Sequence, residues 1–266
     1  MDKTTDTELP ENGAVNEWME LVKTAILAVL IAVIIRSFLF EPFNIPSGSM
    51  KPNLLVGDYL FVSKFSYGYT RFSVPYGVAP IPSRIWDKEP TRGDIVVFKL
   101  PTDTSVDYIK RVIGMPGDTI QMRNGQLFIN RQLVPREFVQ NIDTDQSDHG
   151  SIIREYVQTL PNGVQFNIWE HSDNGRLDNT RLFTVPEGHY FVMGDNRDAS
   201  VDSRVFPNPD PLMPSHNNLG VGFVPYENIL GRADIIFFST NGSAALWEPW
   251  KWPWTIRYER LFNFIK

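Results

Sequence analysis

The sequence of 266 residues contains no cysteine. That absence excludes disulfides, thiolate metal sites, iron–sulfur clusters and a cysteine nucleophile. Histidine is scarce, and none of His149, His171, His189 and His216 lie three or four residues apart, so a helical histidine metal site has no signature. We expect neither a metal nor another cofactor.

Positive charge is also in deficit. Lys and Arg total 25 against 31 Asp and Glu, which gives a formal net charge of -6, and no basic block is present. A nucleic-acid partner is therefore not expected.

The N-terminal region divides into a polar and an apolar part. Residues 1–16 lack an apolar run and are predicted to form a disordered tail. Thr24 to Ile35 reads TAILAVLIAVII, and the apolar character extends over residues 17–40, enough for the roughly 20 residues of a membrane span. A secretory signal peptide and a buried core helix are the alternatives. The N-terminal region is acidic, and no Ala-x-Ala-like cleavage site follows the apolar segment, so both features disfavour a signal peptide. We therefore predict an uncleaved transmembrane anchor.

Residues 41–242 have the signals of strands and turns. Asn124-Gly125 is a strong hairpin signal, and long helical patterns are absent after residue 57. Gly-Asp pairs, which favour tight turns, border apolar segments at Gly57-Asp58, Gly93-Asp94, Gly117-Asp118 and Gly194-Asp195. The predicted fold class is mostly β: a transmembrane helix followed by a β-rich body, with a hairpin-rich insertion over residues 135–183.

The C-terminal segment, residues 243–266, is rich in tryptophan and contains WEPWKWPW followed by a basic, apolar stretch. Tryptophan favours the membrane interface, and a basic amphipathic helix can lie there. Packing on the surface of the body is the equal alternative.

Candidate chemistry starts from the hydroxyl-rich segment IPSGSMKP, in which Pro46 and Gly48 restrict the backbone around Ser49. A serine nucleophile without a histidine needs another base, and a lysine can serve if burial keeps its amine neutral. Lys110 stands among apolar residues in DYIKRVIG. An ordinary loop and a surface lysine are the alternatives, and Lys51, which shares a strand face with Ser49, is a rival base.

Together with the cluster GDNRDASVDSR, these segments resemble bacterial signal peptidase I, the leader peptidase of the Ser-Lys dyad serine peptidase family. The resemblance rests on EPFNIPSGSMKPNLLVGDYLFVSKFSYG, RGDIVVFKLP, DYIKRVIGMPGD and GDNRDASVDSR, in that order behind an apolar segment. Residues 205–221 are an unmatched Pro- and Asn-rich insertion.

The resemblance implies a role for each matching residue. Ser49 is the nucleophile and Lys110 the general base; Ser47 donates to the oxyanion, and Ser200 orients the lysine by a hydrogen bond. The implied supporting scaffold consists of Arg111, Asp202 and Arg204. The implied substrate-binding residues are Phe43, Ile45, Met50, Leu54, Tyr108 and Ile109.

The resemblance also implies the activity. The expected enzyme removes signal peptides from exported preproteins after an Ala-x-Ala-like site, through an acyl-enzyme. Its expected place is the bacterial cytoplasmic membrane, with a single span, lipid contacts and the body on the extracytoplasmic side. A self-cleaving repressor-like Ser-Lys peptidase and a catalytically inactive β-rich envelope binding protein are the alternatives.

Overall fold

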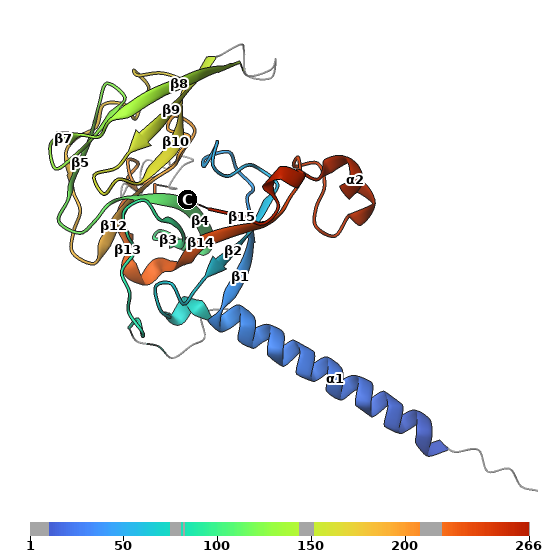
Figure 1. The fold of residues 1–266 in the computed structure, drawn as a ribbon. Helices are drawn as coiled ribbons and strands as arrows, with labels where there is room; N and C mark the ends of the chain where they lie inside the picture. Colours follow the sequence, from blue (N-terminus) through green and yellow to red (C-terminus); the bar gives the residue numbers. More distant parts are fainter. Residues whose placement is uncertain (1–10, 75–80, 82, 144–151, 208–219, 266) are drawn as a thin grey trace, which may run out of the picture.

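A long N-terminal helix leads into a body made of strands, as predicted (Figure 1). The computed structural model describes residues 11–74, 81, 83–143, 152–207 and 220–265. Most of the 205–221 insertion lies outside the described residues. The N-terminal helix and the many strands confirm the expected mostly-β fold class.

The helix α1 (Glu11–Phe38) has different bounds from those predicted. Residues 11–16, expected in a disordered tail, are helical, because extending an existing helix costs far less than nucleating one. The rest of that tail lies outside the described residues. The helix ends at Phe38 rather than at residue 40, because Phe40 pairs with Ser63 and opens the first strand.

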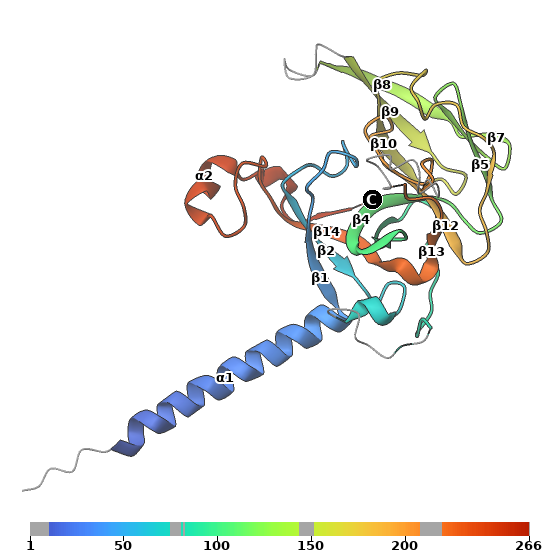
Figure 2. The same ribbon diagram turned by 180° about the vertical axis from the view of Figure 1, so that it is seen from behind.

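The stretch Glu17–Phe38 of α1 is long and apolar enough to cross a membrane. No residue of its most apolar 18-residue window is buried against the body. Figures 1 and 2 both show α1 projecting away from the strands. An apolar helix without protein cover is typical of a membrane span, which fits a membrane-anchored enzyme.

The main sheet is antiparallel, and its strands follow the order β1-β2-β14-β3-β4-β12-β13, with β15 paired to β14. The strands are β1 (Phe40–Asn44), β2 (Asp58–Ser63), β3 (Ile95–Leu100), β4 (Asp103–Gly114), β12 (His189–Met193), β13 (Val224–Pro225), β14 (Ile229–Ser239) and β15 (Asn263–Phe264). β14 thus joins sequence-distant strands, and β4 carries the predicted base.

Two smaller sheets are formed by the strands that lie between β4 and β12 in the sequence. Their strand orders are β11-β5-β6-β7 and β10-β9-β8. The strands are β5 (Thr119–Arg123), β6 (Gln126–Ile129), β7 (Gln132–Leu133), β8 (Arg136–Asp143), β9 (Ile152–Thr159), β10 (Gln165–Glu170) and β11 (Phe183–Thr184). Figure 1 shows β8, β9 and β10 at the end of the body away from α1.

Buried apolar side chains form the core beneath the candidate site. Leu60 and Val62 point inward from β2, and Ile95 and Val97 from β3, into one cluster with Leu54 of the Ser49 loop. Alternating inward residues on neighbouring strands produce this packing. The loop is therefore held by the core as well as by hydrogen bonds.

The C-terminal segment is packed on the body in part. It contains the short helices η4 (Pro249–Lys251), α2 (Trp252–Thr255) and η5 (Tyr258–Arg260). The Trp252 ring packs on Phe238 with centroids 4.9 Å apart, and Arg260 forms an ion pair with buried Asp58 at 2.5 Å. Trp250 and Trp254 are exposed. Both figures show α2 projecting on the same side of the body as α1.

Candidate active site

Ser49 lies in the turn between β1 and β2, and main-chain hydrogen bonds fix its position. Ile45 N–H donates to the carbonyl of Asp58 at 2.8 Å, which closes the loop against β2. The N–H of Asn196 donates to the carbonyl of Ser49 at 3.0 Å, and its side-chain amide donates to Gly48 at 3.2 Å. A buried serine is thus held between two loops.

Lys110 approaches Ser49 from β4, where its backbone stands opposite Val96. The Nζ atom of Lys110 donates to Ser49 Oγ at 2.8 Å and to the carbonyl of Ile109 at 2.9 Å. Residues 61 positions apart in sequence therefore meet. This contact is the geometry that a base-assisted nucleophile requires.

The Lys110 amine is almost completely buried, with 4% of the residue exposed. Burial lowers the pKa of Lys110 from 10.5 to about 8. The carboxylates of Asp202 and Asp195 raise this pKa, whereas the guanidinium of Arg204 lowers it. Desolvation prevails because it penalises the charged ammonium. At pH 7 roughly a tenth of such amines are neutral, a few hundred times more than for an ordinary lysine.

Lys51, the rival base, points elsewhere. Its Nζ atom lies 5.7 Å from the centroid of the Trp169 ring. Tyr108, by contrast, places its ring centroid 5.3 Å from the Lys110 amine and packs edge-on against Phe98. Tyr108 thus covers the Lys110 amine on one side, whereas Lys51 lies beside a different ring.

Ser47 stands next to the dyad. Its Oγ atom lies 3.4 Å from Ser49 Oγ, and the residue is exposed. A hydroxyl there can donate to an oxygen that becomes negative beside Ser49.

The predicted scaffold consists of two separate buried ion pairs. Arg204 binds Asp202 through Nε and Nη2 at 2.9 and 2.8 Å, and Asp202 accepts the N–H of Gly194 at 3.0 Å. Arg111 instead binds Asp195, also through two nitrogens, at 2.9 and 2.8 Å. Removing one partner of such a buried pair typically costs about 3–5 kcal/mol, because the other charge is left buried without compensation. Each pair therefore specifies where the two segments that it joins must lie.

Sequence reasoning missed Asp195 and Asn196 as site residues. Both residues belong to the polar cluster GDNRDASVDSR, but the sequence assigns neither of them a role, although they directly follow β12. Because β12 pairs with β4 and places Met193 opposite Arg111, the next residues necessarily lie beside the dyad. The pairing of these strands was the missing information.

Ser200 is buried beside Asp202, and its hydroxyl makes no hydrogen bond of good geometry to any described group. The expected bond to Lys110 is absent here, because the amine points to Ser49 and Ile109. The Ser200 loop nevertheless approaches closely: a Cβ on Gly194 would lie 2.3 Å from Ser200 Oγ and 2.6 Å from the Ser49 carbonyl. Only glycine permits this approach.

The expected substrate-binding residues fall into two groups. Five share one apolar cluster on the Ser49 side, and Tyr108 packs in a neighbouring cluster. Met50 and Leu54 are fully buried and therefore shape the site from behind. The five residues are Phe43, Ile45, Met50, Leu54 and Ile109.

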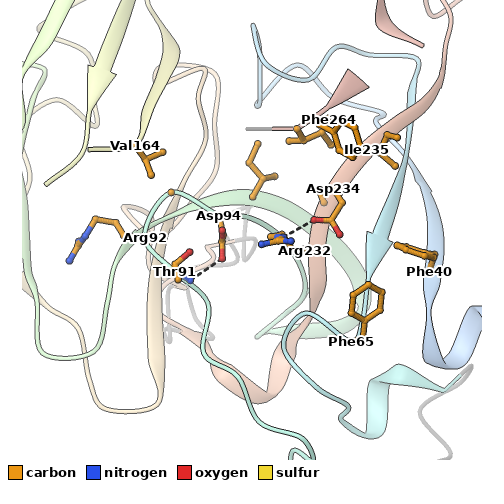
Figure 3. A pocket seen from close by; sticks show the side chains of 14 residues that line it. Phe40, Phe65, Thr91, Arg92, Asp94, Val164, Arg232, Asp234, Ile235 and Phe264 are labelled. Atoms are coloured by element: carbon orange, nitrogen blue, oxygen red, sulfur yellow. Dashed lines mark hydrogen bonds and ion pairs between the residues drawn. The ribbon is translucent and has the colours of Figure 1, made fainter. Parts of the chain in front are cut away.

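A separate apolar cavity of about 740 Å³ lies away from the dyad (Figure 3). Its walls include Phe40, Phe65 and Phe264, with the ion pair Arg232–Asp234 at its edge. Neither Ser49 nor Lys110 lines it. This cavity and the contact between Ser49 and Lys110 thus occupy different places, and the candidate active site is assigned to that contact.

Three carboxylates form an arrangement that has the ligand types for a cation. One oxygen each from Glu170, Asp178 and Asp198 lies within 4.8 Å of the others. Burial raises the pKa of Glu170 to about 8, although Arg197 and Arg136 lower it. A proton held by Glu170 accounts for the closeness of these acids at neutral pH.

Comparison with known proteins gives one consistent result. The sequence matches the family described as signal peptidase, peptidase S26, over residues 18–238. A signal peptidase I of Rickettsia conorii is 42% identical over 221 residues, covering 80% of this chain and 77% of the relative. A signal peptidase I of Rickettsia massiliae is 40% identical over 236 residues, covering 86% and 81%. A crystal structure of a signal peptidase I from Enterococcus faecalis V583 is 27% identical, covers 55% of this chain and 97% of that one, and gives a TM-score of 0.29.

These sequence matches define the class as a serine endopeptidase, a hydrolase. The chain belongs to the signal peptidase family, peptidase S26, and is a serine peptidase that removes signal peptides.

Proposed function

We propose that this chain is a membrane-anchored enzyme that cuts signal peptides from exported preproteins after an Ala-x-Ala-like site, with Ser49 as nucleophile and Lys110 as general base. The observation that carries the proposal is the 2.8 Å contact between a buried amine and a buried hydroxyl. Proximity of this kind makes proton transfer effectively intramolecular.

The reaction begins with the neutral Lys110 amine, whose lone pair takes the proton of the Ser49 hydroxyl as the oxygen attacks the scissile carbonyl. The resulting oxyanion accepts hydrogen bonds from the Ser47 hydroxyl and the Ser49 backbone N–H. The Lys110 ammonium then gives its proton to the leaving amine, and an acyl-enzyme remains. A water molecule, deprotonated by Lys110, releases the product and restores Ser49.

Ser200 acts as a positioning residue in this scheme. Its buried hydroxyl, which makes no hydrogen bond of good geometry to a described group, donates to or accepts from the Lys110 amine during the reaction and so orients the lone pair. The ion pairs Asp202–Arg204 and Arg111–Asp195 keep the Ser200 loop and the lysine strand in place.

Substrate selection follows from the apolar cluster beneath Ser49. Shallow pockets shaped by Phe43, Ile45 and Ile109 accept small side chains and exclude large ones by collision. This supports the expected preference for alanine at the two positions that precede the cut.

The anchor places the reaction at the bilayer surface. α1 crosses the cytoplasmic membrane once and the body stands on the extracytoplasmic side, where exported preproteins emerge. The helix α2 projects on the same side of the body as α1 (Figures 1 and 2). Trp254 of α2 and the nearby Trp250 are exposed and contact lipid headgroups, which suits the interfacial preference of tryptophan. Enzyme and substrate are then concentrated in one plane.

The test is direct cleavage by purified protein in detergent or lipid. A preprotein is incubated with the enzyme, and the N-terminus of the product is sequenced. We expect a single cut after Ala-x-Ala with the wild type and none with Ser49→Ala, which preserves the fold. Normal processing by Ser49→Ala would rule out the assigned nucleophile.

A further inference from the structure

The end of α1 is bonded to the catalytic body and is not a free hinge. The Tyr69 hydroxyl donates to the carbonyl of Phe38 at 2.6 Å, and the two rings meet edge to face with centroids 5.6 Å apart. The N–H of Lys64 donates to the carbonyl of Leu39 at 3.0 Å. Since only Leu39 separates α1 from β1, these contacts fix the one joint between helix and body.

A single carboxylate strengthens the same joint. Glu41 Oε1 accepts from Arg36 Nε and Nη2 at 3.0 and 2.7 Å, and Glu41 Oε2 binds Lys64 Nζ at 2.8 Å. Arg36 belongs to the last turn of α1, whereas Lys64 follows β2. Glu41 thus bridges a cation on the helix to a cation of the body.

Lys64 makes this bridge strong because it is buried. Only 2% of its side chain is exposed, and its amine also donates to the carbonyl of Ser73. Burial lowers the pKa of Lys64, whereas the contact with Glu41 raises it. Removing the Glu41 charge leaves the Lys64 ammonium with the carbonyl of Ser73 and takes from Arg36 its ion pair with the body.

The bridge faces the strand that carries the catalytic lysine. Arg36, Glu41 and Lys64 line a cavity of about 720 Å³ whose other wall contains Ser105 and Asp107 of β4. Lys110 lies further along β4. Any tilt of α1 at this joint therefore moves the helix relative to the catalytic strand.

We propose that Glu41 and Tyr69 are positioning residues that lock α1 to the body and so set the height of Ser49 above the bilayer, which selects the peptide bond that is cut. The inference rests on the proposed function. A signal peptide is held by its apolar segment in the membrane, so the cut is measured from the bilayer. One residue of extended substrate spans about 3.3–3.6 Å. A change of a few ångströms in the height of Ser49 above the bilayer therefore brings a neighbouring peptide bond to the Ser49 hydroxyl.

The test uses a preprotein in lipid vesicles with two overlapping Ala-x-Ala sites at neighbouring registers, and mass spectrometry of both products. Glu41→Gln, Tyr69→Phe and the double variant are compared with wild type. The matched control is Asp173→Asn, since Asp173 also bridges two cations, Arg136 at 2.7 Å and Arg154 at 2.8 Å. These two cations belong to β8 and β9, at the end of the body away from α1.

We expect wild type and Asp173→Asn to favour one site. Glu41→Gln and Tyr69→Phe should raise the minor product by at least about threefold, because a loosened joint populates several heights. Cleavage of a short soluble peptide should change less than twofold in the same variants, since Ser49 and Lys110 are untouched. A purely structural role would lower both activities together.

An unchanged product ratio in the Tyr69→Phe variant and in the double variant would overturn the inference. So would a shifted ratio accompanied by an equal loss of peptide cleavage. Should Glu41→Gln fail to fold, Tyr69→Phe decides alone, because it removes one hydroxyl and keeps the ring contact. Absence of cleavage by wild type would refute the proposed function instead, which keeps the two failures distinct.

Discussion

Lowering the pH from 9 to 6 should slow peptide cleavage by about 90-fold, because a base with a pKa of about 8 is mostly neutral at the upper value and about 1% neutral at the lower. The cause is the buried Lys110 amine, which must be uncharged to accept the Ser49 proton. Below pH 7 the logarithm of kcat/KM should fall by one for each pH unit, and above about pH 8.5 the rate should level off.

The assay is kcat/KM for a soluble peptide at constant ionic strength, with tryptophan fluorescence to confirm that the protein stays folded. Substrates that titrate in this range are avoided. The control variants are His171→Gln and His189→Gln. If a histidine were the base, kcat/KM would begin to fall near pH 6.5, where an ordinary histidine titrates, and not near pH 8. They should leave the profile unchanged.

Two results would refute the reasoning. A rate that is constant down to pH 6 would exclude a lysine that titrates near neutrality. A rate that rises tenfold per unit through pH 9.5 without levelling would mean that burial does not perturb Lys110.

Three substitutions test other parts of the site. Ser47→Ala should lower kcat by about 100-fold with little change in KM for a short peptide, because it removes one donor to the oxyanion. Gly194→Ala should lower kcat/KM by about 100-fold, since its Cβ would lie 2.6 Å from the Ser49 carbonyl and must displace that loop; rates near wild type would contradict the close approach. Glu170→Gln should flatten the pH dependence of stability, measured by urea unfolding at pH 5 and pH 8. Because its pKa is raised, Glu170 keeps a proton in the folded state that the unfolded chain releases above a pH of about 4.5. The stability of the wild type therefore falls as the pH rises toward 8, and the stability of the variant should fall less.

Local turn chemistry was predictable from sequence. Asn124 and Gly125 both have positive φ, 47° and 71°, and join β5 to β6, as the Asn-Gly pair predicts. The pairs Gly57-Asp58 and Gly117-Asp118 likewise stand where β2 and β5 begin. These signals are encoded by a few neighbouring residues and need no tertiary information.

Strand pairing was beyond the sequence. β14 lies between β2 and β3, and its register with both strands shifts at irregular positions. Such pairing depends on packing between distant segments and on bulges that local patterns do not encode. For the same reason the sequence does not predict the partner of Arg111. Ser49 and Lys110 can be proposed from their motifs, and the structure brings these two side chains into contact.

The most direct measurement of the central claim is the pKa of Lys110 itself. Lysines labelled with ¹³C at Cε and ¹⁵N at Nζ are titrated by NMR in the detergent-solubilised protein, and the Lys110 signal is assigned by its loss in Lys110→Met. The account predicts that this one amine titrates near 8. A Lys110 signal that titrates above 10 would contradict it.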